Sequence, residues 1–218
     1  YEEASKEWQK REVELLTLNE LPAETRDGKL ISLTANIEVA EETDSVLAHG
    51  ADGIGLFRSE FLFLQSGGYA SEEWQYDYYS RVLKAMKGKP VTIRTLDVGG
   101  DKLLTDFQPV DEKNPILGWR AIRFCLARLD IFKTQLRALF KASIHGDLRI
   151  MFPMISGIEE VTNVLAIVDE VKNELQNEHI QFVEDVPLGI MIEIPSAALT
   201  SDILAKKVNF FSIGTNDL

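Results

Sequence analysis

The chain has 218 residues, of which 45% are apolar, so it is long and apolar enough to bury a sizeable core. Its formal net charge of −12 argues against a general nucleic-acid surface, and an anionic ligand would need a local basic pocket. One cysteine allows no internal disulfide and fits a reducing cytosol, and no apolar run approaches the ~20 residues that a membrane span needs. We therefore expect a cytoplasmic globular protein that neither binds nucleic acid nor inserts into a membrane.

The N-terminal residues differ in character from the rest. Residues 1–20 predict a mostly solvated helix with a thin apolar seam, which ends at Leu21-Pro22. Such a helix has no core of its own, so residues 1–26 are expected to be a linker helix from an N-terminal domain outside this sequence. Residues 27–218 are expected to form a second unit.

From residue 31 onward, short apolar strands alternate with helices. Ser71 and Asp130 are expected to cap the N-termini of two of these helices. The expected strands are 31–37, 53–57, 91–93, 149–154, 188–192 and 209–214. The expected helices are 38–49, 71–88, 114–129, 130–146, 158–177 and 195–207.

This alternation predicts the class of fold. Strands that are apolar on both faces are typical of a parallel sheet covered by helices. No GxGxxG motif follows the first strand, so a dinucleotide-binding fold has no support. Polar residues instead follow the carboxyl ends of the strands, where a (β/α)8 barrel builds its active site. Because six strands are found and a barrel needs eight, we expect an α/β fold, a TIM barrel truncated after about the sixth strand.

The stretch 91–102, VTIRTLDVGGDK, carries the most chemistry. Arg94 follows a short strand, and Lys102 follows a pair of glycines that allow close backbone approach to a ligand. A guanidinium fork and an ammonium group suit a multiply charged oxyanion such as phosphate. The alternative is a solvated loop in which Arg94 pairs with Asp97 or Asp101.

Other strand ends add further polar groups. Glu193 and Asp217 follow neighbouring strands and suit a hard divalent cation such as Mg²⁺, which takes one or two carboxylates together with substrate oxygens and water. The cations suit a phosphoryl group whose charge spreads during transfer. Each residue alone would more often be a salt-bridge partner, but together they favour a binding site. The strand-end set comprises Arg58, Arg94, Lys102, Glu193, Asn216 and Asp217.

Other candidates have simpler interpretations. Cys125 lies among apolar helical residues, which favours packing over a nucleophile. Arg120 and Arg123 could line a helix face, although Arg120 is near a helix start and could reach the barrel mouth. The three histidines are not spaced like metal ligands and are expected to be surface caps: His49, His145 and His179.

From residue 27 onward, six runs occur in this order: GADGIGLFRSEFLFL, TIRTLDVGGDK, NPILGWRAIRF, LRIMFPMI, GIMIEIPSAAL and FFSIGTNDL. Through these runs the chain resembles the phosphoenolpyruvate-utilising enzymes, specifically the C-terminal barrel of enzyme I of the sugar phosphotransferase system. The resemblance implies an enzyme that transfers the phosphoryl group of phosphoenolpyruvate to its own histidine and then to a small carrier protein for sugar uptake. It also implies a homodimer formed through the barrel.

The resemblance also implies roles for individual residues. Glu193 and Asp217 would bind Mg²⁺, which would neutralise the phosphate and steady the pyruvate enolate. No catalytic residue is expected in this chain, because the family's phosphorylated histidine lies in an N-terminal domain with a GGxTSH-type motif, which is absent here, and its proton-donor cysteine lies beyond Leu218. The fragment alone is therefore expected to be inactive. The substrate would contact Arg58, Arg94, Lys102, Arg120, Asn216 and Asp217.

The sequence leaves two alternatives open. One is the barrel of a pyruvate phosphate dikinase or phosphoenolpyruvate synthase, but dikinases tend to carry a histidine after RTE, where this chain has Phe61. The other is a non-catalytic module that only binds phosphoenolpyruvate or mediates dimerisation. A GGxTSH segment upstream in the parent gene would argue against the module.

Overall fold

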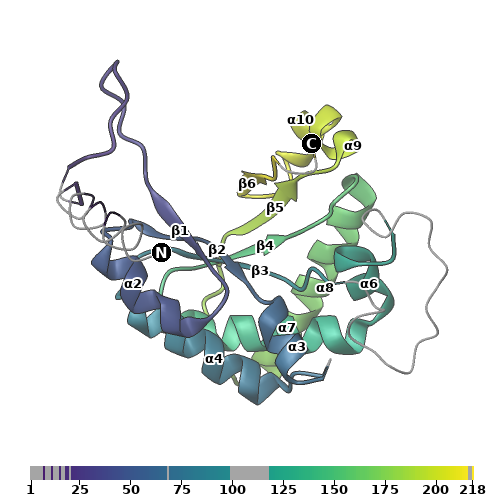
Figure 1. Cartoon of the computed structure of the whole chain (residues 1–218). Coiled ribbons are helices and arrows are strands. Elements are labelled where there is room, and N and C mark those ends of the chain that lie inside the picture. The colour runs from purple at the N-terminus through teal and green to yellow at the C-terminus, as the bar shows by residue number, and fades with distance from the viewer. Residues whose placement is uncertain are drawn as a thin grey trace.

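A curled parallel sheet forms the centre of the computed structural model, which describes residues 7, 11, 15, 18–19, 21–67, 69–98, 118–215 and 218. Its six strands run in the order β1-β2-β3-β4-β5-β6, and every neighbouring pair is parallel. The sheet curves into a half-barrel (Figure 1), which confirms the expected truncated TIM-type fold. The strands are β1 (Thr34–Ile37), β2 (Gly53–Arg58), β3 (Val91–Arg94), β4 (Leu148–Phe152), β5 (Leu188–Ile192) and β6 (Phe210–Ile213).

Three long helices pack against one another beside the sheet (Figure 1). They are α4 (Glu72–Ala85), α7 (Leu129–Ala142) and α8 (Ile158–Asn177). Arg137 on α7 joins them, because its guanidinium pairs with Glu72 of α4 and with Glu174 of α8. The shorter described helices are η1 (Ala40–Glu42), α2 (Thr43–Ala48), α3 (Glu60–Gln65), α6 (Ala121–Ala127), η2 (Ser143–His145), α9 (Pro195–Leu199) and α10 (Ser201–Leu204).

Most of the expected elements are confirmed. All six strands are present, and β5 and α8 have the predicted bounds. The expected helix 38–49 is divided into η1 and α2, and the expected helix 195–207 is divided at Thr200 into α9 and α10. Helix α3 was not expected. Most of residues 1–20 and residues 114–117 lie outside the described residues, so the linker helix stays a prediction.

The two expected helix caps have different outcomes. The Ser71 hydroxyl accepts a hydrogen bond from Trp74 N at 3.2 Å, which confirms it as the N-cap of α4. The cap expected at Asp130 is wrong, because α7 begins one residue earlier and its N-cap is Arg128. Asp130 lies in the first turn, where its carboxylate accepts hydrogen bonds from the Arg128 guanidinium at 2.6 and 2.9 Å.

Burial follows the position of each strand in the sheet. All five residues of β5 are buried, whereas the edge strands β1 and β6 are partly exposed. Cys125 on α6 is fully buried, and burial raises the pKa of its thiol, which supports its expected role in packing. None of the described helices is both long and apolar enough to cross a membrane.

Close approach of two strands explains one glycine and provides a stability test. A Cβ added at Gly53 would lie 2.4 Å from the Pro90 carbonyl oxygen, a backbone atom that cannot rotate away. We expect Gly53→Ala to lower the free energy of unfolding by about 1–3 kcal/mol, measured by urea denaturation. Gly157→Ser is the matched control, because this N-cap of α8 has open space around it and serine is favoured at N-caps. Equal stability of the two variants would contradict the expected clash.

Candidate functional site

Two arginines end neighbouring strands side by side. Arg58 is the last residue of β2 and Arg94 is the last residue of β3, and the parallel pairing places them directly opposite each other. Neighbouring strands lie only ~4.8 Å apart, so two positive charges are held close together. Such an arrangement needs nearby carboxylates, or an anionic ligand, to offset the repulsion.

Carboxylates from adjacent segments hold both arginines. Arg58 Nη1 lies 2.6 Å from Glu38 Oε1, just after β1. Arg94 Nη2 lies 2.6 Å from Glu60 Oε1 at the start of α3, and its Nη1 lies 3.0 Å from Asp97 Oδ2. The pairing of Arg94 with Asp97 that the sequence left as an alternative therefore exists. This ion pair with Asp97 fixes the direction of the Arg94 guanidinium, and it is therefore compatible with ligand binding.

Arg120 joins the same group through Asp97. It is the N-cap residue of α6, and its Nη2 lies 2.8 Å from Asp97 Oδ1. Asp97 therefore bridges Arg94 and Arg120 with its two carboxylate oxygens. The structure thus places Arg120 beside Arg94 at the strand ends rather than on a remote helix face. This is the second of the two positions that the sequence left open for Arg120.

Arg58 and Arg94 also line one pocket of ≈340 Å³. The Arg58 side chain is 45% exposed, whereas the Arg94 side chain is only 13% exposed. Arg58 is thus readily reached from solvent, and Arg94 lies deeper, where a charge-assisted hydrogen bond is stronger than in bulk water. The remaining lining residues are Glu38, Glu60, Phe61 and Leu64.

Burial and charge act together on the central ion pair. Burial alone would lower the pKa of Arg94, but Glu60, Asp97 and Glu193 outweigh it, so the pKa is raised and the guanidinium stays charged. Burial raises the pKa of Glu60, and its attraction to Arg94 offsets only part of that rise. Glu60 is therefore a carboxylate whose charge depends on the presence of Arg94.

Glu193 directly follows β5 and is only 4% exposed. Its Oε1 accepts a hydrogen bond from Met154 N at 2.6 Å, after the end of β4. Met154 has the left-handed φ of 57°, which is uncommon for a residue other than glycine. Such local conformations are typical of positions that the surrounding structure constrains strongly. The charge of Glu193 reaches Arg94, as its effect on the arginine pKa indicates.

The donor set bears on a divalent cation. A carboxylate such as Glu193 is the kind of hard oxygen ligand that Mg²⁺ prefers. The described residues contain no cluster of three or more acidic, histidine or cysteine ligands. Mg²⁺ needs only one or two carboxylates when substrate oxygens and water complete its shell, so a single described carboxylate is compatible with it. Three candidates, Lys102, Asn216 and Asp217, lie outside the described residues.

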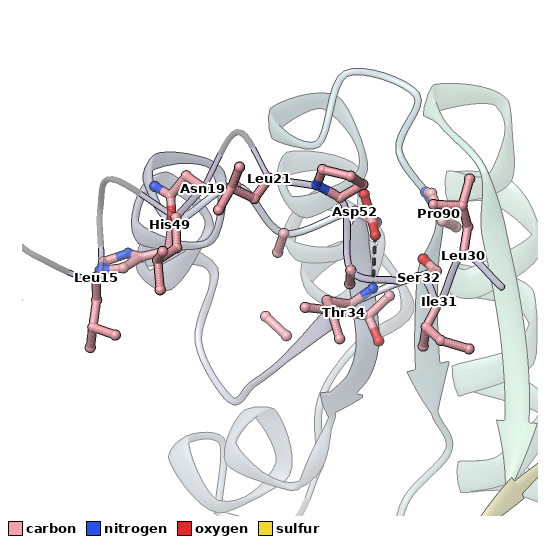
Figure 2. A pocket seen from close by; sticks show the side chains of 17 residues that line it. Leu15, Asn19, Leu21, Leu30, Ile31, Ser32, Thr34, His49, Asp52 and Pro90 are labelled. Carbon is pink, nitrogen blue, oxygen red and sulfur yellow. Dashed lines mark hydrogen bonds between the residues drawn. The ribbon is translucent and has the colours of Figure 1, made fainter. Parts of the chain in front are cut away.

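A second, larger pocket lies at the opposite ends of the strands. This pocket has a volume of ≈910 Å³. Figure 2 shows side chains that line it, among them Asp52, which precedes β2, and Pro90, which precedes β3. Asp52 accepts a hydrogen bond from Leu33 N at 2.7 Å there. Its lining is largely leucine, isoleucine, alanine and proline, and none of the candidate site residues is part of it. It is therefore distinct from the arginine pocket.

The structure places further carboxylates at the site. Glu38 and Glu60, for which no role was expected, pair with Arg58 and Arg94. Asp97, which was expected only as an alternative partner of Arg94, pairs with both Arg94 and Arg120. The closeness of arginine and acid in RSE and RTLD was an available signal. Gln135 was also missed. It is a polar residue within the apolar face of α7, between Phe132 and the neighbouring Leu136, and it is fully buried.

The half-barrel with its arginines and acids at the carboxyl ends of the strands defines a protein of the α/β-barrel class, whose candidate site lies at the face where such barrels build their active sites. Comparison with known proteins makes this specific. The family model described as PEP-utilising enzyme, PEP-binding domain, matches residues 12–218. The chain therefore belongs to the phosphoenolpyruvate-utilising enzyme family.

Named relatives agree with this assignment. The chain is 47% identical over 218 residues to the phosphoenolpyruvate-protein phosphotransferase of Staphylococcus carnosus, covering 100% of this chain and 38% of that protein. It is 46% identical to the protein of the same name from Priestia megaterium, with the same coverage. The Staphylococcus aureus strain MSSA476 protein is 49% identical over 205 residues, covering 94% of this chain and 36% of that protein. The chain thus spans little more than a third of these relatives.

Proposed function

We propose that this chain is the phosphoenolpyruvate-binding part of a phosphoenolpyruvate-protein phosphotransferase. The observation that carries the proposal is the register pair of Arg58 and Arg94, which lines one pocket in a chain of the phosphoenolpyruvate-binding family. In the longer protein, the phosphoryl group would leave the enol oxygen of phosphoenolpyruvate for a histidine of another domain. The phosphohistidine would then supply a small carrier protein.

The arginines would bind the phosphate by exchanging partners. In the structure, Glu38 holds Arg58 and Glu60 holds Arg94. A phosphate dianion entering the pocket would take over hydrogen bonds from these carboxylates, and the planar forks suit its oxygens. Asp97 would keep Arg94 oriented during this exchange. Lys102, Arg120 and Asn216 are proposed to complete the substrate contacts.

Glu193 and Asp217 are proposed as the Mg²⁺ ligands. The position of the Glu193 carboxylate supports this role, because it is a hard oxygen ligand held directly after β5, at the carboxyl end of that strand. When bound, Mg²⁺ would neutralise part of the phosphate charge and stabilise the enolate as a Lewis acid. The hydrogen bond from Met154 N would keep the Glu193 carboxylate in a fixed orientation.

The relatives' names favour the phosphotransferase over the dikinase alternative, and so does Phe61 at the position where dikinases tend to carry histidine. A homodimer formed through the barrel remains part of the proposal. Downstream, the carrier protein would pass the phosphoryl group on for sugar uptake. These assignments concern the longer protein.

A chimeric enzyme tests the proposal directly. This chain would replace the matching 218-residue region of the Staphylococcus carnosus phosphotransferase, to which it is 47% identical. We expect the chimera to form pyruvate from phosphoenolpyruvate and to phosphorylate the carrier protein only when Mg²⁺ is present. A chimera that folds, as judged by circular dichroism and thermal unfolding, but transfers no phosphoryl group would contradict the proposal.

A further inference from the structure

A single buried amide joins the two loops that carry the site. Gln135 on α7 is fully buried. Its Oε1 accepts a hydrogen bond from Leu96 N at 3.0 Å, in the segment after β3. Its Nε2 donates to Ser59 Oγ at 3.0 Å, in the segment after β2, and to Tyr79 OH at 3.1 Å on α4.

Both loop partners are chain neighbours of site residues. Ser59 lies between Arg58 and Glu60, so its position constrains the backbone of both neighbours. Leu96 is similarly placed, since it lies two residues after the strand-end arginine of β3 and directly before Asp97. The amide therefore hydrogen-bonds within one residue of Arg58 and within two residues of Arg94, the two arginines that line the pocket.

The network leaves the amide only one orientation. Leu96 N can only donate, so the amide oxygen must face it and the NH₂ group must face the two hydroxyls. Tyr79 OH in turn donates to Gln75 Oε1 at 3.1 Å, and Gln75 Nε2 donates to Ala70 O at 2.8 Å. A chain of satisfied hydrogen bonds in a dry interior is rigid, because each unpaired group would carry a desolvation cost.

We propose that Gln135 is a positioning residue, which fixes the strand-end loops of β2 and β3 relative to each other so that Arg58 and Arg94 are correctly spaced for one phosphate group. This inference rests on the proposed function. It goes beyond that function because Gln135 itself lies under the loops and does not line the pocket. A misplacement of about 1 Å at a reacting group can cost on the order of 100-fold in rate.

The test compares two buried glutamines of the same network in the chimeric enzyme. Gln135→Leu removes the links to both loops. Gln75→Leu is the matched control, because Gln75 is equally buried and bonds to Tyr79, but its amide nitrogen donates to Ala70 O rather than to either loop segment. We expect both to lower the unfolding temperature, but only Gln135→Leu to raise KM for phosphoenolpyruvate by about tenfold or more.

A shorter amide guards against a variant that fails to fold. Gln135→Asn keeps a polar group but cannot reach both Ser59 and Leu96, so we expect it to fold and to raise KM in the same direction. A crystal structure of this variant should show the Ser59 and Leu96 segments displaced relative to each other. KM values equal to those of Gln75→Leu, or loops that keep their places in the variant structure, would overturn the proposal.

The two proposals fail in different ways. If the unmodified chimera does not consume phosphoenolpyruvate, the proposed function is wrong. The crystal structure of Gln135→Asn then still decides the positioning role, since displaced loops support it and unmoved loops overturn it. If the unmodified chimera is active and the variants match the control, only the role of Gln135 is wrong.

Discussion

Arg94→Lys is expected to lower kcat/KM for phosphoenolpyruvate at least ~10-fold in the chimeric enzyme, about the loss of one good charge-assisted hydrogen bond. The reason lies in geometry rather than charge. Arg94 uses two different nitrogens to reach Glu60 at 2.6 Å and Asp97 at 3.0 Å. A lysine ammonium is a single point of charge on a flexible stem, so it cannot span two acids and also present a planar edge to phosphate.

Two further lysine variants make this test specific. Arg58→Lys should behave like Arg94→Lys, because Arg58 is its register partner and lines the same pocket. Arg128→Lys should be nearly neutral, because the Arg128 guanidinium bonds to Asp130 and to Tyr69 OH outside that pocket. Phosphoryl transfer to the carrier protein should be measured for all three at fixed Mg²⁺ and salt. Equal activity would mean that Arg58 and Arg94 are ordinary salt-bridge partners.

The strands could be predicted because their signal is local. A buried parallel strand is a short apolar run bounded by polar residues, and LGIMI at 188–192 is such a run. Helix α8 was equally clear, since its apolar residues recur along one face over twenty positions. From these elements the half-barrel follows, and with it the expectation that strand-end residues share one edge.

Features that depend on tertiary contacts could not be predicted in this way. Ser59 is the N-cap residue of helix α3, but its hydroxyl does not cap the helix and accepts the hydrogen bond from Gln135 instead. Six residues with a run of apolar side chains carry no helical period, so the sequence gives no reason to expect α3. The prediction of an N-cap at Asp130 was wrong for a similar reason, because the Asp130 carboxylate accepts hydrogen bonds from the Arg128 guanidinium instead.

The ion-pair pattern at the site shows the same limit. The sequence offers several acids close to Arg94, and both Asp97 and Asp101 stayed open as its partner. The pairing with Glu60 depends on β2 and β3 being neighbours, because Glu60 begins the helix after β2. Sequence reasoning therefore finds which residue types gather at the mouth, whereas the partners of each arginine follow from strand order and register.

Glu193→Gln is expected to have the other large effect, at least ~100-fold on the rate of phosphoryl transfer, with a higher Mg²⁺ concentration needed for half-maximal activity. Glutamine has the same shape and keeps a carbonyl oxygen that can accept the hydrogen bond from Met154 N. Stability should therefore change little. Only the negative charge is lost, and a neutral amide is a much poorer ligand for Mg²⁺ than a carboxylate.

The measurement is a titration of Mg²⁺ against phosphoryl-transfer rate in the chimera, with thermal unfolding run in parallel. Glu160→Gln is a suitable control. Glu160 lies in the first turn of α8 and also accepts a hydrogen bond from a backbone N–H, that of Ser156 at 2.6 Å, yet it pairs with Arg123 and does not line the arginine pocket. We expect its Mg²⁺ dependence to match that of the unmodified chimera. If Glu193→Gln also retained that dependence, the buried carboxylate after β5 would be a structural group that holds Met154, and the metal ligands would have to be sought elsewhere.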